Sequence, residues 1–233
     1  MNTVWAVLVF ILCGWFTFLV GRQWFRNHKF SHLFWSISLA LSFLGSLSYC
    51  ISFWENPHSE AWFILYYLFG AMWMPSIMGL GSLALVVKNR VLIVTSLLVG
   101  IMAVAGGILL AGARISASAL ALVHGGAGSN VISPGVWLVP LILLNTFGAV
   151  AVVGVGLWSA WKTYRKKTPT RFLYGNLFLA LGVLVISAAG SAARFGVEQF
   201  FWIVMLIGWM ITFVGYRFLT PRPYLHRSIV KDA

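Results

Sequence analysis

The chain contains the stretch VLIVTSLLVGIMAVAGGILLAGA, residues 91–113, in which no residue is charged. Hydrophobic stretches of about 18 or more residues with few charges are candidates for membrane-spanning helices. The whole composition agrees with this interpretation, because 61% of the 233 residues are hydrophobic and 9% are charged. A soluble domain carries about 25% charged residues. We therefore expect lipid, and not water, to cover most of the surface.

Seven such stretches occur along the chain. Their approximate limits are 3–21, 31–53, 61–87, 91–113, 136–161, 172–193 and 199–219. The alternating strands of an outer-membrane barrel are absent from the sequence, and helices are the other way to satisfy the backbone in lipid. The sequence thus predicts an all-α membrane protein, a bundle of seven transmembrane helices in a single domain over residues 1–233. No soluble domain is expected, which excludes a fused kinase, cyclase or DNA-binding module.

The positive charges predict the orientation of this bundle. Fourteen of the sixteen lysines and arginines lie in alternate loops and in the C-terminal tail, whereas Arg114 and Arg194 lie on the opposite side. Basic loops face the cytoplasm. We therefore expect the N-terminus outside, the C-terminus in the cytoplasm, and a multi-pass protein of the cell (inner or plasma) membrane. The same bias accounts for the net charge of +12, so no nucleic-acid partner is expected.

Small residues predict how the helices pack. Ser38, Ser42, Ser46 and Cys50 recur at four-residue spacing and so share one face of the second stretch. Small polar residues at this period let helices approach closely and form hydrogen bonds across the contact. We interpret this face as a packing seam, with the wall of a polar cavity as the alternative. Cys13 and Cys50 lie at different depths, so no disulfide is expected between them.

Two residues inside the stretches are candidates for a pocket. Pro75 interrupts the third stretch, where it removes a backbone donor and can kink the helix. A packed bend is the simpler interpretation, and a pocket beside the preceding aromatic residues is the alternative. Asn145 lies about a third of the way into the fifth stretch, where an unpaired amide would be costly. We expect its partner to lie on another helix.

The predicted outer side holds most of the acidic residues. Glu55, His58 and Glu60 lie close together between the second and third stretches. Their side chains are of the types that bind zinc, but three candidates at this spacing match no established motif. We interpret this segment as a solvated connection and predict no metal. A site for a metal or a cationic ligand is the alternative.

The turn between the last two stretches carries Arg194 and Glu198, four residues apart, which we expect to form an ion pair. The longest loop, residues 114–135, begins with a segment that predicts a short surface helix, and its later glycines predict turns. If the bundle has a pocket, we expect its mouth to lie outside, lined by this pair and this loop.

The sequence offers little to hold a cofactor. No stretch has a charged residue near its centre, which weakens proton relays, ion pumps and voltage sensors as functions. The last stretch has no lysine, so retinal has no anchor. The five histidines lie in loops or at helix ends, which disfavours a buried bis-histidine haem. We therefore predict no cofactor and no catalytic residue.

Residues 22–53, RQWFRNHKFSHLFWSISLALSFLGSLSYCISF, and residues 61–85, AWFILYYLFGAMWMPSIMGLGSLAL, follow a recognisable order. A basic turn, an aromatic helix, an acidic outer turn and a tyrosine-rich helix with a central proline resemble the seven-helix sensor regions of bacterial histidine kinases. The full chain is also similar to uncharacterised bacterial seven-helix membrane proteins with WSAW and AARFG segments, here residues 158–161 and 192–196. These resemblances imply sensing but no catalytic residues. The chain ends at Ala233 without an effector domain, so signalling would need a separate partner.

Together these patterns favour a non-enzymatic membrane protein, either a sensor module or an accessory subunit of a membrane complex. The basic loop 162–171 is the expected docking site for a membrane or cytoplasmic protein, or for anionic lipid. The alternative is a transporter or channel for a small neutral or apolar solute, since prolines and glycines allow helices to bend. A lipid-modifying enzyme is a third possibility, but it needs acid–base or metal residues that only the outer loops supply.

Overall fold

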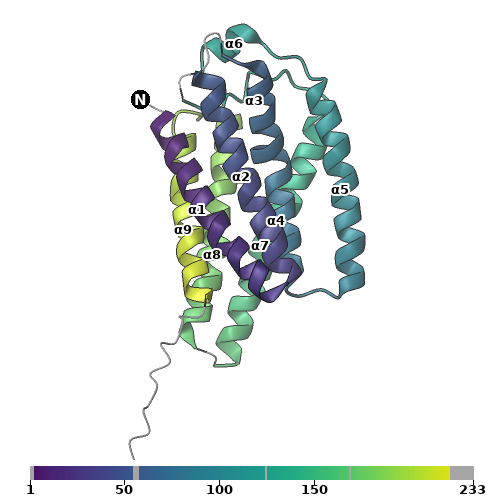
Figure 1. Ribbon diagram of the computed structural model, residues 1–233, viewed down its shortest axis with the longest axis vertical. Helices are drawn as coiled ribbons and strands as arrows, with labels where there is room; N and C mark the ends of the chain where they lie inside the picture. Colours follow the sequence, from purple (N-terminus) through teal and green to yellow (C-terminus); the bar gives the residue numbers. More distant parts are fainter. Residues whose placement is uncertain (1–2, 55–57, 124, 168, 221–233) are drawn as a thin grey trace, which may run out of the picture.

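The computed structural model describes residues 3–54, 58–123, 125–167 and 169–220, and it consists of long helices joined by short connections (Figure 1). In chain order the elements are α1 (Thr3–Asn27), α2 (Phe30–Trp54), α3 (Glu60–Tyr66), η1 (Tyr67–Trp73), α4 (Met74–Leu83), α5 (Asn89–Ala111), α6 (Ala117–Ala121), α7 (Leu138–Arg165), α8 (Thr170–Arg194) and α9 (Phe201–Leu219). Within the described residues, seven helical stretches are long and apolar enough to cross a membrane, with α3, η1 and α4 together forming the third. The predicted all-α protein with seven candidate spans is therefore confirmed.

Two helices extend well beyond the limits predicted from hydropathy, whereas the third span ends at Leu83, before the predicted limit of residue 87. The first stretch was expected to end at residue 21, but α1 continues to Asn27, and α7 likewise continues past residue 161 to Arg165. Hydropathy marks only the part of a helix that lies in hydrocarbon. Arginine and lysine side chains can reach the headgroup region from the last turns, so the helix continues where the apolar run stops.

The third span is not a regular α-helix. Tyr67–Trp73 form the π-helical segment η1, in which the Met74 N–H bonds back to the Phe69 carbonyl. Pro75 follows at once and lacks an N–H, and its ring crowds the carbonyl four residues earlier, that of Ala71. A wider turn moves this carbonyl away from the ring, which accounts for a π-helical segment at this point. The interruption expected at Pro75 is present in this form.

Glycines bring α8 and α9 into backbone contact. A Cβ atom added at Gly182 would lie 2.7 Å from Thr212 N and 2.8 Å from Gly208 O, and one at Gly215 would lie 2.8 Å from Gly175 O. No side chain larger than hydrogen fits at these positions. Close packing through small residues is the usual way in which helices associate in lipid, where the hydrophobic effect does not separate helix from solvent.

The serine face of α2 is a packing seam, as predicted. Ser38, Ser42 and Ser46 are all buried. The Ser38 hydroxyl donates to the Met74 carbonyl at 2.9 Å, and Ser42 Oγ lies 3.3 Å from Cys13 Sγ. These bonds join α2 to α4 on one side and to α1 on the other. Both cysteines are free.

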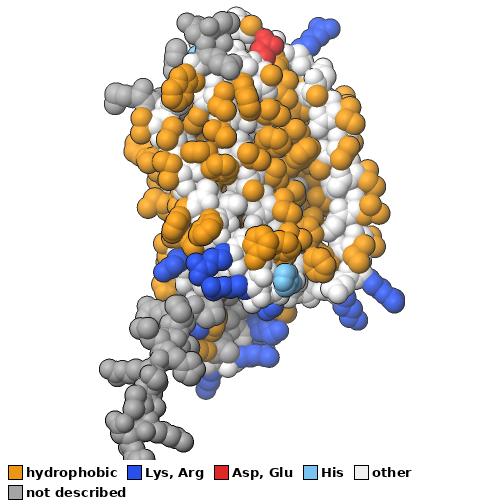
Figure 2. Space-filling model, in the orientation of Figure 1, with side chains coloured by type: hydrophobic (Ala, Val, Ile, Leu, Met, Phe, Trp, Pro, Cys, Tyr) orange, Lys and Arg blue, Asp and Glu red, His pale blue; other side chains and the backbone are white. Residues whose placement is uncertain are grey.

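The two ends of the bundle differ in charge. We call the end with residues 112–137 the loop end, and the end with residues 22–29, 84–90 and 162–171 the basic end. Figure 2 shows a broad apolar belt between them, with most lysine and arginine side chains gathered at the basic end. Helix α5 stands at one side of the bundle (Figure 1) and exposes apolar residues such as Ile93, Ile101 and Ile108. Such a surface implies contact with a lipid bilayer.

Candidate functional site

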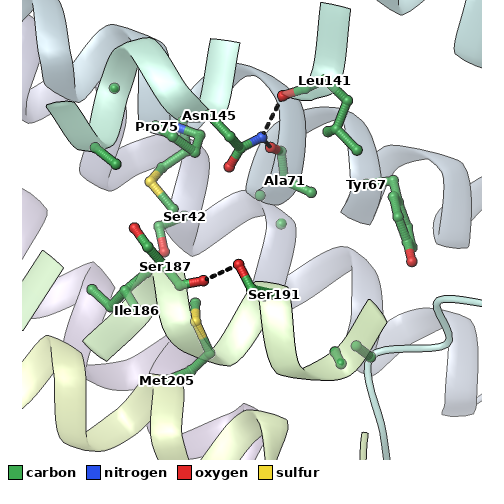
Figure 3. A pocket seen from close by; sticks show the side chains of 18 of the residues that line it. Ser42, Tyr67, Ala71, Pro75, Leu141, Asn145, Ile186, Ser187, Ser191 and Met205 are labelled. Carbon is green, nitrogen blue, oxygen red and sulfur yellow. Dashed lines mark hydrogen bonds between the residues drawn. The ribbon is translucent and has the colours of Figure 1, made fainter. Parts of the chain in front are cut away.

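A cavity of about 430 Å³ lies inside the bundle, toward the loop end (Figure 3). Its walls come from α2, the third span, α7, α8 and α9, and Ala127 and Ser129 of the long loop close it at one end. Small-molecule sites in proteins typically measure about 300–1,000 Å³. The cavity is therefore large enough for a small ligand and is built from elements far apart in the sequence.

Asn145 and Pro75 lie together in the wall of this cavity. The Asn145 amide nitrogen donates to the Ala71 carbonyl at 2.6 Å and to the Leu141 carbonyl of its own helix at 2.8 Å (Figure 3). Ala71 is the residue whose carbonyl the missing N–H of Pro75 would have bonded in a regular α-helix. Asn145 thus supplies the donor that Pro75 lacks. The expectation that its partner lies on another helix is confirmed.

The orientation of the Asn145 amide follows from these two contacts. Both neighbours are carbonyl oxygens, which only accept, so the nitrogen must face them. The amide oxygen is turned away from Leu141 (Figure 3) and is left as an acceptor in the cavity wall. One side chain therefore repairs the broken helix and presents a polar atom to the cavity.

Hydroxyl groups line much of the remaining wall. Ser42 and Ser46 of α2 contribute to it, as do Thr146 of α7 and Ser187 and Ser191 of α8. The two interpretations of the serine face are therefore compatible, since α2 packs through this face and also lines the cavity with it. Apolar wall residues include Met74, Met78, Val183 and Met205. The mixture suits a ligand that is largely apolar with one polar part.

The cavity opens sideways between α7 and α8. Ile142 and Val150 of α7 and Gly190 and Ser191 of α8 line the cavity and are also exposed at the surface. We call this gap the side opening. Val150 lies twelve residues into α7, about 18 Å from its start at 1.5 Å per residue. The side opening therefore reaches from near the loop end well into the apolar belt.

Glu198 holds the long loop onto the bundle. Its carboxylate accepts from the Gly128 N–H at 3.1 Å, from the Ser129 N–H at 3.0 Å and from the Ser129 hydroxyl. Gly128 has φ +64°, a conformation that favours glycine, and it turns both N–H groups toward the carboxylate. The Tyr49 and Tyr67 hydroxyls donate to the Gly126 and Gly128 carbonyls at 2.8 and 3.3 Å. The loop is thus fixed over one end of the cavity.

The predicted ion pair between Arg194 and Glu198 is wrong. The Arg194 guanidinium lies 5.6 Å from the centre of the Trp137 ring, and Glu198 is occupied by the loop. Helix α8 ends at Arg194, and Gly196 reverses the chain direction with φ +90°. The four-residue spacing of a helix therefore does not apply here. The loop and Arg194 line the cavity, whereas Glu198 lines a separate hollow under residues 119–131.

The segment with Glu55, His58 and Glu60 lies apart from the cavity. Glu55 falls outside the described residues. The His58 ring lies 4.7 Å from the Phe53 ring, and Glu60 is in the first turn of α3. Among the described residues, no group of three histidine, cysteine or acidic side chains is arranged to hold a metal ion. None of these residues lines the cavity in the described part of the chain.

Sequence reasoning missed the aromatic residues at the loop end of the cavity. Tyr66, Tyr67 and Trp202 line it, and their rings lie among others from α2 and α3. Trp202 is 3% exposed, and its ring centre lies 4.6 Å from that of Tyr49 and 5.8 Å from that of Tyr66. The sequence signal was the aromatic start of the last stretch, but nothing in it indicated which helices would surround Trp202.

No family model matches this chain, and no curated protein or solved structure matches it. The resemblance to kinase sensor regions rests on the sequence segments quoted above. The interpretation of the site therefore depends on its geometry. Arg194 is the only charged residue among the described residues that line the cavity. The wall can donate and accept hydrogen bonds and attract an anion.

Proposed function

We propose that this protein is a non-enzymatic membrane sensor module that binds a small molecule in the cavity between α2, α4, α7, α8 and α9. The cavity itself carries the proposal. It has a volume of about 430 Å³, and its walls are apolar with several hydroxyl groups. One wall contains the break in the third span, where the Asn145 amide donates to the Ala71 carbonyl. Such a mixture of apolar surface and few convergent polar groups is typical of ligand sites. A ligand that contacts η1 and α7 would act directly on the break in the third span.

Helices α7 and α8 would couple ligand binding in the cavity to a partner protein. Both helices line the cavity near the loop end, and they meet at the basic end around residues 162–171. There the Lys162 ammonium lies 4.8 Å from the Trp158 ring and the Arg165 guanidinium 4.7 Å from the Trp161 ring. We place this end in the cytoplasm because fourteen of the sixteen positive charges belong to it or to the C-terminal tail. A cytoplasmic or membrane protein partner would dock on this charged turn.

The test is gentle purification from native membranes followed by native mass spectrometry. We expect a stoichiometric partner protein that is lost when Lys166 and Lys167 are changed to glutamine. We also expect its association to change in Gly190→Leu, which fills the side opening. A protein that carries no partner, or one indifferent to both variants, would contradict the sensor proposal.

A second candidate is a transporter or channel for a small neutral or apolar solute. One observation favours it, because η1 is a helix break in the cavity wall, and transporters often build substrate sites at broken helices. Flux of such a solute in proteoliposomes, abolished by Asn145→Leu, would support this function. Binding without flux would support the sensor.

A further inference from the structure

The side opening faces the apolar belt of the bundle. Its rim residues on α7 and α8 lie in helices long and apolar enough to span the bilayer. Gly190, on this rim, has no neighbouring heavy atom within 4 Å of the position that a Cβ would take, so a larger side chain fits there. A ligand that enters from the apolar belt must first dissolve in the membrane, which favours an amphiphile over a water-soluble solute.

The loop end of the cavity carries one positive charge. Arg194, the last residue of α8, lines the cavity and is exposed. Glu198 is bonded to the Gly128 and Ser129 N–H groups of the loop. An anionic group fits this end.

The rest of the cavity suits an apolar chain. Its volume of about 430 Å³ lies near the lower end of the range of about 300–1,000 Å³ that is typical of small-molecule sites, which favours a ligand with one chain over one with two. The wall away from the loop end includes Met74, Met78, Val183 and Met205. The methionine side chains among them adapt readily to a flexible chain.

We propose that the cavity binds a single-chain amphiphile, which enters between α7 and α8 and places its anionic head group against Arg194. A carboxylate or a phosphate would pair with this guanidinium, so a free fatty acid and a lysophospholipid share the required chemistry. This inference rests on the proposed ligand-binding function and names the class of ligand. Arg194 acts here as the recognition residue.

The test is ligand titration of the purified protein in mild detergent, with binding read by native mass spectrometry. The probes are palmitic acid, 1-hexadecanol with the same chain length but no charge, a lysophosphatidic acid, and phosphatidylglycerol with two chains. The key variants are Arg194→Gln and Gly190→Leu. Gly154→Leu is the matched control, because Gly154 is also an exposed helical glycine with nothing within 4 Å, but it does not line the cavity.

We expect one palmitate or one lysophosphatidic acid per protein, bound at least tenfold more tightly than hexadecanol. Arg194→Gln should weaken binding of the acid about tenfold and leave binding of hexadecanol unchanged. Gly190→Leu should weaken binding of both probes, and Gly154→Leu should weaken binding of neither. The two acidic probes distinguish a carboxylate from a phosphate source, and either supports the inference.

Three results would overturn it. Equal binding of acid and alcohol, with no effect of Arg194→Gln, would remove the anionic head group but leave a ligand-binding cavity and the sensor function intact. Preferred binding of phosphatidylglycerol would show that the occupant has two chains. If Gly190→Leu and Gly154→Leu reduced binding of the acid equally, the acid would bind outside the cavity. If a different co-purified molecule were then lost in Gly190→Leu alone, the sensor proposal would stand and the proposed ligand class would not.

Discussion

Two helix contacts in this bundle are built in opposite ways. Helices α8 and α9 touch through glycines on both sides, so that main chain meets main chain and no space is left. The third span and α7 also touch through glycines, at Gly79 and Gly148, but one turn further toward the loop end the contact is made by a polar side chain. There Asn145 bridges the gap to the Ala71 carbonyl, and the cavity begins.

The difference shows how a membrane bundle can contain a cavity without exposing backbone to lipid. In a glycine contact every backbone N–H and C=O group keeps its hydrogen bond within its own helix, so no group needs a partner from a neighbouring helix. A proline break frees a carbonyl that lipid cannot satisfy, and this demands a polar side chain from a neighbouring helix. That side chain links the two helices by a hydrogen bond and also takes up space between them. A void beside the break follows from the same residues that repair it.

Gly182→Leu tests the glycine contact and should have the largest effect. Its Cβ would meet Thr212 N at 2.7 Å and Gly208 O at 2.8 Å, and neither backbone atom can move without shifting α9. We expect a loss of about 3 kcal/mol or more, at the upper end of the cost of overpacking. Thermal unfolding in detergent, followed by size-exclusion chromatography of the unheated protein, measures it.

Gly190→Leu on the same helix is the control for this substitution. Both changes replace a glycine of α8, but Gly190 has open space where the side chain would go. We expect its melting temperature to stay within a few degrees of the parent protein. Equal losses in the two variants would show that the contact with α9 is not what makes Gly182 necessary.

Asn145→Leu tests the polar contact. It leaves the Ala71 carbonyl without its donor from α7 while keeping the side-chain volume similar. We expect a loss of about 2 kcal/mol, since interhelical hydrogen bonds in membranes contribute about 1–2 kcal/mol in peptides and an unsatisfied carbonyl adds a penalty. Asn176→Leu is the control, because Asn176 donates to Phe172 of its own helix at 2.7 Å. A similar loss in both variants would contradict the role of Asn145 as a bridge.

The sequence predicts the helical spans better than the contacts between them. Seven spans were predictable because hydropathy sums over about 20 residues and single errors cancel. Pro75 and Asn145 were identifiable as unusual, but their connection was not, since it depends on which helix faces the break. A sequence argument could have reached Ala71, the residue four before Pro75, by asking which carbonyl the proline leaves without a donor. The relation between Arg194 and Glu198 was mispredicted because Gly196 ends the helical geometry between them.

Glu198→Gln tests whether the loop end of the cavity is closed by a fixed loop. The carboxylate holds the Gly128 and Ser129 N–H groups, and an amide offers one uncharged acceptor oxygen in its place. Hydrogen bonds to charged groups are worth about 1.5–3 kcal/mol, so we expect amide exchange at residues 126–131 to accelerate about tenfold or more. Hydrogen–deuterium exchange mass spectrometry measures this directly. Glu60→Gln, in the exposed first turn of α3, should leave the same peptide unchanged.

Ser38→Ala has the smallest expected effect and separates two kinds of serine on α2. The Ser38 hydroxyl donates across the seam to the Met74 carbonyl, next to the break, whereas the Ser48 hydroxyl donates to Leu44 of its own helix. Both side chains are buried. Interhelical bonds of this kind average about 0.6 kcal/mol, so Ser38→Ala should lower the free energy of unfolding by about that amount. Ser48→Ala should leave it unchanged or raise it slightly, because a hydroxyl bonded back to its own helix weakens that helix a little. If the two variants behaved alike in reversible unfolding, the Ser38 hydrogen bond would not stabilise the contact between α2 and the third span. Close packing alone would then hold these two helices together, as it does at the glycine contact.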